Sequence, residues 1–121
     1  MSTLDEAKLL QNRTKAFAVR IIKAFARLPR GEAVRVIGRQ FLRSGISLAA
    51  NYRAARRARF APDFISKINV VVEETDETLL WLELLAEAEL AKKTLVKPLM
   101  NECDELLKIF SASLATAKRN R

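Results

Sequence analysis

Apolar side chains recur at steps of three or four residues along almost the whole chain, and this spacing breaks only where one of the three prolines stands. The spacing places the apolar side chains on one face of a helix. It predicts four long helices, over about residues 3–28, 32–58 and 62–90, and from about residue 98 onward. Because short links join them, consecutive helices must run antiparallel. The sequence therefore predicts an all-α fold, an antiparallel up-down-up-down four-helix bundle that forms a single domain over residues 1–121.

Local signals agree with these boundaries. Thr3 and Glu6 have the spacing of a capping box, and Pro62 followed by Asp63 suits the first turn of a helix. The β-branched run at residues 70–72 could instead form a strand, but helical spacing continues on both sides of it. The predicted core stripe consists of Leu10, Phe17, Ile21, Phe25 and Leu28, then Val34, Ile37, Phe41, Gly45, Leu48 and Tyr52, then Phe64, Ile68, Val71, Thr75, Leu79, Leu82 and Ala86, and finally Leu99, Cys103, Leu106, Phe110, Leu114 and Ala117.

The second and third predicted helices carry opposite charge. Residues 30–61 hold eight arginines and one glutamate, a net charge of +7, whereas residues 62–91 hold eight acids and one lysine, a net charge of −7. Residues 1–29 and 92–121 contribute +4 each, so the net charge of +8 lies outside this central pair. In a helical projection the arginines share a face with Leu42, Ile46 and Ala49, and the acids share one with Leu80 and Leu84. Such mixtures of arginine and aliphatic side chains are typical of protein interfaces.

Two interpretations of these faces are open. Intramolecular ion pairs could tie them together, with Arg43 opposite Glu77 and Arg39 near Trp81 and Glu83, but exposed pairs contribute only about 0.2–1 kcal/mol each and would not explain the aliphatic residues. Alternatively, the arginine face of one subunit docks on the acidic face of the next, a contact that can close into a ring. The predicted homo-oligomer interface consists of Arg39, Arg43, Leu42, Ile46, Arg53, Arg57, Glu73, Glu77, Leu80 and Leu84.

Several motifs occur in an order that is similar to one known family. They are R-T-K-A-F-A-V-R-I-I-K at 13–23, Leu28-Pro29, R-S-G-I-S-L-A-A-N-Y-R-A-A at 43–55, D-F-I-S-K-I at 63–68 and E-E-T-D-E-T-L-L-W-L-E-L-L at 73–85. Over about residues 10–115 the chain resembles the four-helix bundle family named for proteins encoded in 23S rRNA intervening sequences. Many relatives have a glutamate just after the Asn-Tyr pair, where this chain reads Arg53-Ala54-Ala55-Arg56-Arg57, so no role of that acid carries over.

The resemblance implies an up-down bundle and suggests partners. Relatives include a pentameric, barrel-shaped accessory protein of diversity-generating retroelements, which binds nucleic acid and a reverse transcriptase. For this chain the resemblance therefore implies a homo-oligomer with a pentameric ring among the options, a nucleic-acid ligand, and a protein partner such as a reverse transcriptase.

The surplus of positive charge also suits a polyanion. If the arginine face is used within a ring, phosphates would meet the first and fourth helices. With few aromatic residues and no recognition motif, the contact would be to the backbone of RNA or DNA, and about four phosphates predict a log–log salt slope near −3 to −4. Charge that serves only solubility, and a protein-protein scaffold that never touches nucleic acid, remain open alternatives. The candidate nucleic-acid contacts are Arg13, Lys15, Arg20, Lys23, Arg27, Lys108, Lys118, Arg119 and Arg121.

Three polar residues, Ser44, Ser47 and Asn51, follow the border between the core stripe and the surface of the second helix. They are expected to hydrogen-bond a neighbouring helix, since a buried amide left unpaired costs about 1–3 kcal/mol. A pore or inter-subunit contact is the alternative. Trp81 is expected to fill the core or an interface rather than stack on bases. Cys103 falls on the apolar stripe and is expected to be inert.

Catalytic residues are scarce. The chain has no histidine, which removes the commonest general base and the Glu-x-x-His ligands of di-iron bundles. Facing acid pairs, Glu74 with Glu77 and Glu102 with Glu105, could hold Mg²⁺ as in all-α nucleotide pyrophosphohydrolases, but the first pair is expected to point outward. The sequence therefore predicts a non-enzymatic protein without a metal or cofactor. A single cysteine, no leader-like start and no apolar run near 20 residues predict a cytoplasmic location with no membrane span.

Overall fold

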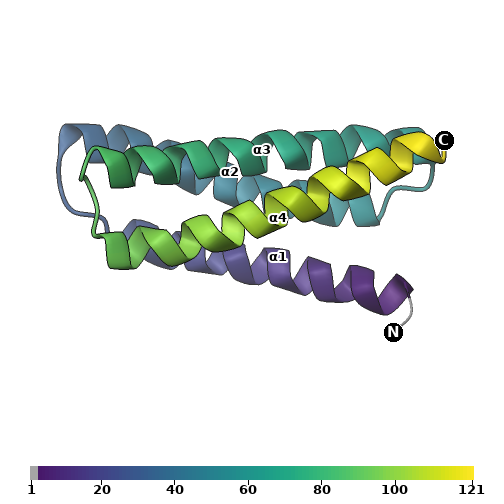
Figure 1. Ribbon diagram of the computed structural model, residues 1–121, viewed down its shortest axis with the longest axis horizontal. Coiled ribbons are helices and arrows are strands. Elements are labelled where there is room, and N and C mark those ends of the chain that lie inside the picture. Colours follow the sequence, from purple (N-terminus) through teal and green to yellow (C-terminus); the bar gives the residue numbers. More distant parts are fainter. Residues whose placement is uncertain (1–2) are drawn as a thin grey trace.

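Four helices form an antiparallel bundle in the computed structural model, which describes residues 3–121. They are α1 (Thr3–Ala26), α2 (Glu32–Arg56), α3 (Ala61–Glu87) and α4 (Lys93–Arg119). Each helix packs on the next, and α4 returns to contact α1 (Figure 1). The prediction of an all-α up-down bundle is confirmed, and residues 70–72 lie within α3 rather than in a strand. None of these helices is both long and apolar enough to cross a membrane.

The core runs along the whole bundle and receives side chains from every helix. Phe17, Phe41, Leu82 and Phe110 are almost completely buried. Most of the predicted stripe is buried or half-buried, but the buried surface of each helix is wider than one line because each helix packs between two neighbours. Buried positions outside the predicted stripe are Thr14, Ala18, Ala24, Gly38, Ser44, Ala55, Thr78, Leu85 and Val96.

α1 and α2 pack tightly at Gly45. A Cβ atom at this position would lie 2.7 Å from Cγ2 of Ile21, which is closer than real Cβ contacts come. Ile21 is completely buried, so it has little room to move aside. The glycine therefore sets the distance between these two helices.

The start of α4 differs from the sequence prediction. The helix begins at Lys93, five residues before Pro98, so the predicted start near Pro98 was wrong. Pro98 lies in the second turn, where its missing N–H leaves the carbonyl of Thr94 without the usual helical partner. The added turn buries Val96 in the core, and this burial offsets the lost hydrogen bond.

The other helix ends lie two or three residues before their predicted positions. After α1 and α2 the chain makes tighter turns, in which the N–H of Arg27 donates to the carbonyl of Ala24 and the N–H of Arg57 to that of Ala54. α3 ends in a Schellman motif, because the N–H of Leu90 donates to the carbonyl of Leu85 at 2.9 Å. The predicted capping box of Thr3 and Glu6 lies outside the described residues, since the structure does not describe the side chain of Thr3.

Candidate nucleic-acid interface

A line of polar groups crosses the middle of the core. Ser44 of α2 and Thr78 of α3 share a hydrogen bond of 2.7 Å, and the thiol of Cys103 of α4 donates to the carbonyl of Thr75 at 3.3 Å. Burial raises the pKa of Cys103 to about 12. These groups therefore join three helices internally and are not available to a ligand.

The other two border residues bond within their own helix. The amide of Asn51 donates to the carbonyl of Ser47 at 2.9 Å and lies 3.1 Å from its hydroxyl oxygen. The expected link from Asn51 and Ser47 to a neighbouring helix is therefore not made within the described part of this chain.

Trp81 packs against the core, and its indole N–H is buried without a hydrogen-bond partner among the described residues.

An ion pair holds α1 to α4 halfway along their contact. The guanidinium of Arg13 donates to both carboxylate oxygens of Glu102, at 2.8 and 2.7 Å, and lies 3.4 Å from Glu105. The hydrogen bond from Arg13 lowers the pKa of Glu102 and raises that of Arg13. Lys108 is also paired, at 3.0 Å from Asp104 one turn earlier. Two of the nine cations predicted to meet nucleic acid are thus engaged within the chain.

A second ion-pair cluster joins α2 to α3. Arg43 lies 3.3 Å from Glu74 and 3.3 Å from Glu77, so the pairing of Arg43 with Glu77 occurs within one subunit. The expectation that Glu74 points outward was wrong, because its side chain is only 15% exposed. Since Glu102 and Glu105 face Arg13 instead, the two acid pairs do not share a site. Within residues 3–121 no group of three or more potential metal ligands comes together.

Three predicted cations of α1 converge on one shallow groove. Arg20, Lys23 and Arg27 line it together with Leu95 and Leu99 of α4, and its volume is about 180 Å³. No ion pair involves these three cations in the described part of the chain. Their charges therefore remain available to an anion, and we refer to this region as the α1 cation groove.

The remaining predicted cations of α4 lie at the opposite end of the bundle. α1 and α4 are antiparallel, so Lys118, Arg119 and Arg121 lie far along the bundle from Arg27 (Figure 1). The nine predicted residues therefore do not form one patch. Arg56 at the end of α2 and Arg59 and Phe60 of the α2–α3 turn lie near the C-terminal end of α4, but they were not among the predicted nucleic-acid contacts. An arginine-rich run that ends in an aromatic residue could have pointed to them.

A groove between α1 and α2 gathers exposed aliphatic side chains. Val19 and Ile22 of α1 and Ile46 of α2 line it, with Lys15 and Arg53 also lining it, and its volume is about 380 Å³. Ile46 and Arg53 were predicted interface residues, whereas Val19 and Ile22 were missed although they interrupt the polar face of their helix. The nearby Leu42 instead packs partly against the core.

The predicted acidic face on α3 keeps two exposed leucines. Leu80 is 45% and Leu84 38% exposed, and Glu73 beside them is exposed as well. Arg39 and Arg57 are exposed on α2 and at its C-terminal cap. The aliphatic groove and these leucines belong to different helices, so one molecule cannot cover its own leucines with its own groove.

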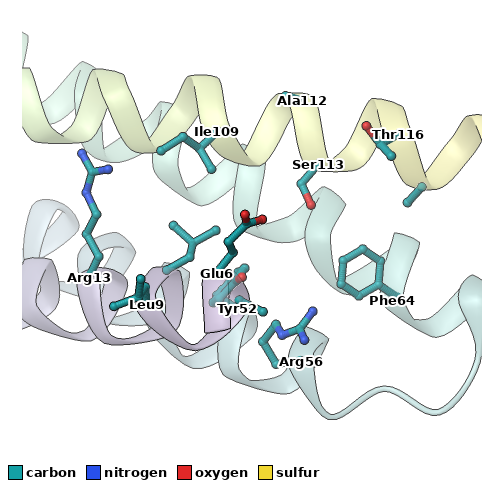
Figure 2. A pocket seen from close by; sticks show the side chains of 13 residues that line it. Glu6, Leu9, Arg13, Tyr52, Arg56, Phe64, Ile109, Ala112, Ser113 and Thr116 are labelled. Atoms are coloured by element: carbon teal, nitrogen blue, oxygen red, sulfur yellow. The ribbon is translucent and has the colours of Figure 1, made fainter. Parts of the chain in front are cut away.

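A groove of about 720 Å³ opens between α1 and α4 where the two helices diverge. Figure 2 shows Arg13 extending from α1 toward α4 at one end of this groove and Phe64 at the other, with Ser113 projecting from α4. Tyr52 and Arg56 of α2 reach it from behind, and burial raises the pKa of Tyr52. Small α4 side chains such as Ala112 and Ala117 leave this space unfilled.

The chain matches a known family over most of its length. Residues 8–112 match the model of the 23S rRNA-intervening sequence protein family. The chain belongs to this family. Among solved structures, it is similar to a protein of unknown function from the S23 ribosomal protein family of Bacteroides thetaiotaomicron VPI-5482. The two share 32% identity with a TM-score of 0.82, over 90% of this chain and 97% of the other. No curated protein matches.

Proposed function

We propose that this 23S rRNA-intervening sequence protein is a non-catalytic, self-associating bundle that binds the backbone of RNA or DNA without sequence preference. The observation that carries the proposal is the α1 cation groove. Three cations at helical spacing line one hollow, and none of them forms an ion pair in the described part of the chain, because the three acids of α4 are paired with Arg13 and Lys108. Arg20 is the least free of the three, since its charge helps to lower the pKa of Glu102. Clustered cations without partners are suited to bind successive phosphates.

The groove also explains why the contact would lack sequence preference. Its other lining residues are Leu95, Leu99 and Ala24, which offer no hydrogen bonds to base edges. Base edges are distinguished mainly by hydrogen-bonding side chains such as asparagine, glutamine and bidentate arginine in a groove of the duplex. A helix face with cations alone therefore binds phosphates and positions the protein, but reads no sequence.

The test measures binding of a fluorescein-labelled 20-nucleotide RNA by anisotropy between 50 and 300 mM NaCl. We expect a log–log salt slope near −3 to −4 for the native chain, and a slope smaller by about two when Arg20, Lys23 and Arg27 are replaced by glutamine, since each phosphate contact contributes about 0.7–0.9. The matched control replaces Lys8, Arg35 and Lys67 by glutamine, which removes the same charge outside the groove and should leave the slope nearly unchanged.

Equal losses in the two triple variants would assign the binding to net charge rather than to the groove. An absence of RNA binding by the native chain at 50 mM salt would refute the nucleic-acid role and favour a protein-protein scaffold.

Self-association is supported by the aliphatic groove between α1 and α2 and by the exposed leucines of α3. The groove includes Lys15 and Arg53, whereas Leu80 and Leu84 lie among acids. Both surfaces therefore present aliphatic side chains, and their charges are opposite. Because they are different surfaces, a contact between two copies leaves one surface of each free, and repetition of the contact leads to a ring. A pentamer is one such ring, and a reverse transcriptase is one protein partner that family resemblance suggests.

A further inference from the structure

The most exposed large apolar side chain among the described residues is Phe60, which is 68% exposed in the α2–α3 turn. Its backbone carbonyl accepts a hydrogen bond from the N–H of Phe64, so Phe60 occupies the N-cap position of α3. Serine, threonine, aspartate or asparagine would cap the helix there, but a phenyl ring cannot. The ring therefore neither packs in the core nor caps the helix. An exposed aromatic residue at a position where a capping residue would stabilise the helix suggests a function.

Six cations lie at the same end of the bundle as this ring. Arg56 at the end of α2 precedes it, as do Arg57 and Arg59 of the turn, and all three are exposed. The C-terminal end of α4 lies at the same end of the bundle, because Arg56, Phe64 and Thr116 line one groove (Figures 1 and 2). α4 adds Lys118, Arg119 and Arg121, which are exposed as well. Over the described range no ion pair involves any of these six cations, and the acids of this end are Asp5, Glu6 and Asp63.

We propose that Phe60 is a stacking platform for an unpaired nucleobase, with the flanking phosphates held by Arg57, Arg59 and the cationic end of α4. Single-stranded nucleic acid offers both groups that this surface suits, since its phosphates meet cations and its free bases present flat apolar faces. A duplex hides those faces inside its stack. An anionic membrane would suit the charge, but anchoring in a lipid interface requires a wider apolar face than this one ring.

The inference rests on the proposed nucleic-acid function and adds a preference to it. The α1 cation groove contacts phosphates only and so accepts single and double strands alike. The ring at the other end contacts a base and so favours single strands. The two sites belong to opposite ends of the bundle and are separable by mutation.

The experiment compares three 20-mer probes by anisotropy at low salt: oligo(dT), an abasic single strand of the same length, and a DNA duplex. Phe60→Ala should weaken oligo(dT) binding at least about fivefold, the low end of the loss of one base stack, and leave the abasic strand and the duplex within twofold. Phe60→Leu keeps an apolar side chain without the ring and should behave like Phe60→Ala. Phe60→Trp should restore affinity and show fluorescence quenching on oligo(dT).

Each other outcome overturns the inference. If Phe60→Ala binds oligo(dT) as the native chain does while the α1 groove variant loses affinity, the stacking site fails and the proposed function stands. If the native chain binds none of the probes, the proposed function fails as well. Equal losses on all three probes, or native behaviour of Phe60→Leu, would contradict a role in stacking. Loss of binding to phosphatidylserine vesicles in Phe60→Ala, with oligo(dT) binding intact, would assign the ring to a membrane.

Discussion

At the scale of single residues, the bond between Arg13 and Glu102 joins α1 to α4. α1 and α4 diverge beyond this point and leave the 720 Å³ groove between them. Two short hydrogen bonds join the guanidinium and the carboxylate, and such bidentate pairs are stronger than neutral hydrogen bonds. The pair is only partly exposed, so solvent weakens it less than an ordinary surface pair. It joins the two helices at the edge of this groove.

Glu102→Gln should therefore lower the free energy of unfolding at pH 7 by about 1–2 kcal/mol, measured by urea denaturation. Arg13 lowers the pKa of Glu102 in the folded state, so ionised Glu102 stabilises the fold at pH values above the ordinary carboxyl pKa of about 4.3. This contribution is lost as the pH falls through the lowered folded-state pKa, and the difference between the two proteins should shrink there. Glu105→Gln is the control and should cost less than about 1 kcal/mol, since that side chain is 65% exposed. A pH-independent difference would contradict this account.

Cys103 makes a second prediction at this scale. Its pKa of about 12 leaves almost no thiolate at neutral pH, and its side chain is completely buried. We expect no reaction with a maleimide or an aromatic disulfide under native conditions on the timescale of minutes. Full reaction should follow in denaturant. Rapid labelling of the native chain would show that the core opens locally far more often than its packing suggests.

At the scale of the helices, the fold depends on where helices approach and where they end. α1 and α2 pack tightly at Gly45, while Gly38, two turns earlier, meets only the flexible end of Leu28 at 3.0 Å and Phe25. Glu89 lies two residues after the end of α3 and has a φ of 57°, in the left-handed region that favours glycine.

Gly45→Ala should destabilise the protein by about 1–3 kcal/mol, because the added methyl group must displace the buried Ile21 and the loss exceeds the gain in helix propensity of about 1 kcal/mol. Gly38→Ala adds the same methyl group beside a side chain that can move. Its stability should stay within about 0.5 kcal/mol of the native chain or rise, as measured by thermal and chemical denaturation. Equal effects of the two substitutions would contradict a special role for the contact at Gly45.

Glu89→Gly should stabilise the protein by about 1 kcal/mol, since a glycine adopts the left-handed conformation without the strain that a side chain brings. Glu89→Ala is the matched control, because it removes the same charge but keeps a Cβ atom. Equal stability changes in the two variants would show that the charge, and not the backbone conformation, matters at this position. Urea denaturation of the three proteins distinguishes these outcomes.

At the scale of the whole molecule, charge is divided among surfaces that face different directions. The ion pairs of Arg43 show that the arginine face and the acidic face partly satisfy each other within one chain. These ion pairs do not account for the exposed aliphatic residues. Val19, Ile22 and Ile46 on one side and Leu80 and Leu84 on the other would lie in water in an isolated molecule. Their burial between copies is the physical basis of the proposed assembly.

Replacing Leu80 and Leu84 by aspartate should convert the assembly into a monomer of 13.7 kDa, measured by size exclusion with light scattering at micromolar concentration. Each aspartate removes an apolar contact with the groove and must lose water on assembly, a cost of several kcal/mol that pairing with Lys15 or Arg53 offsets only in part. Leu9→Asp is the control, since Leu9 is exposed in the α1–α4 groove instead. A native chain that is already monomeric would refute the assembly. An oligomer that survives the double substitution would place its interface elsewhere.

The candidate site was only partly predictable from the sequence. The cations Arg20, Lys23 and Arg27 could be named in advance, because they share a face of one helix. The sequence could not show that these three cations form no ion pairs while Arg13 does, since the acids that pair with Arg13 lie 89 residues or more along the chain. A linear pattern records which residues share a helix face, but it contains no distance between faces of different helices.

The sequence by itself determined the four helices, their antiparallel order and most of the core, because apolar side chains at a period near 3.6 must share one buried face and short links allow only one direction of return. The tertiary structure alone decided which charges are paired, that α4 begins before Pro98, and that α1 and α4 separate into a groove. Those outcomes depend on how much apolar surface each added turn can bury and on distances of a few ångströms between side chains far apart in the chain.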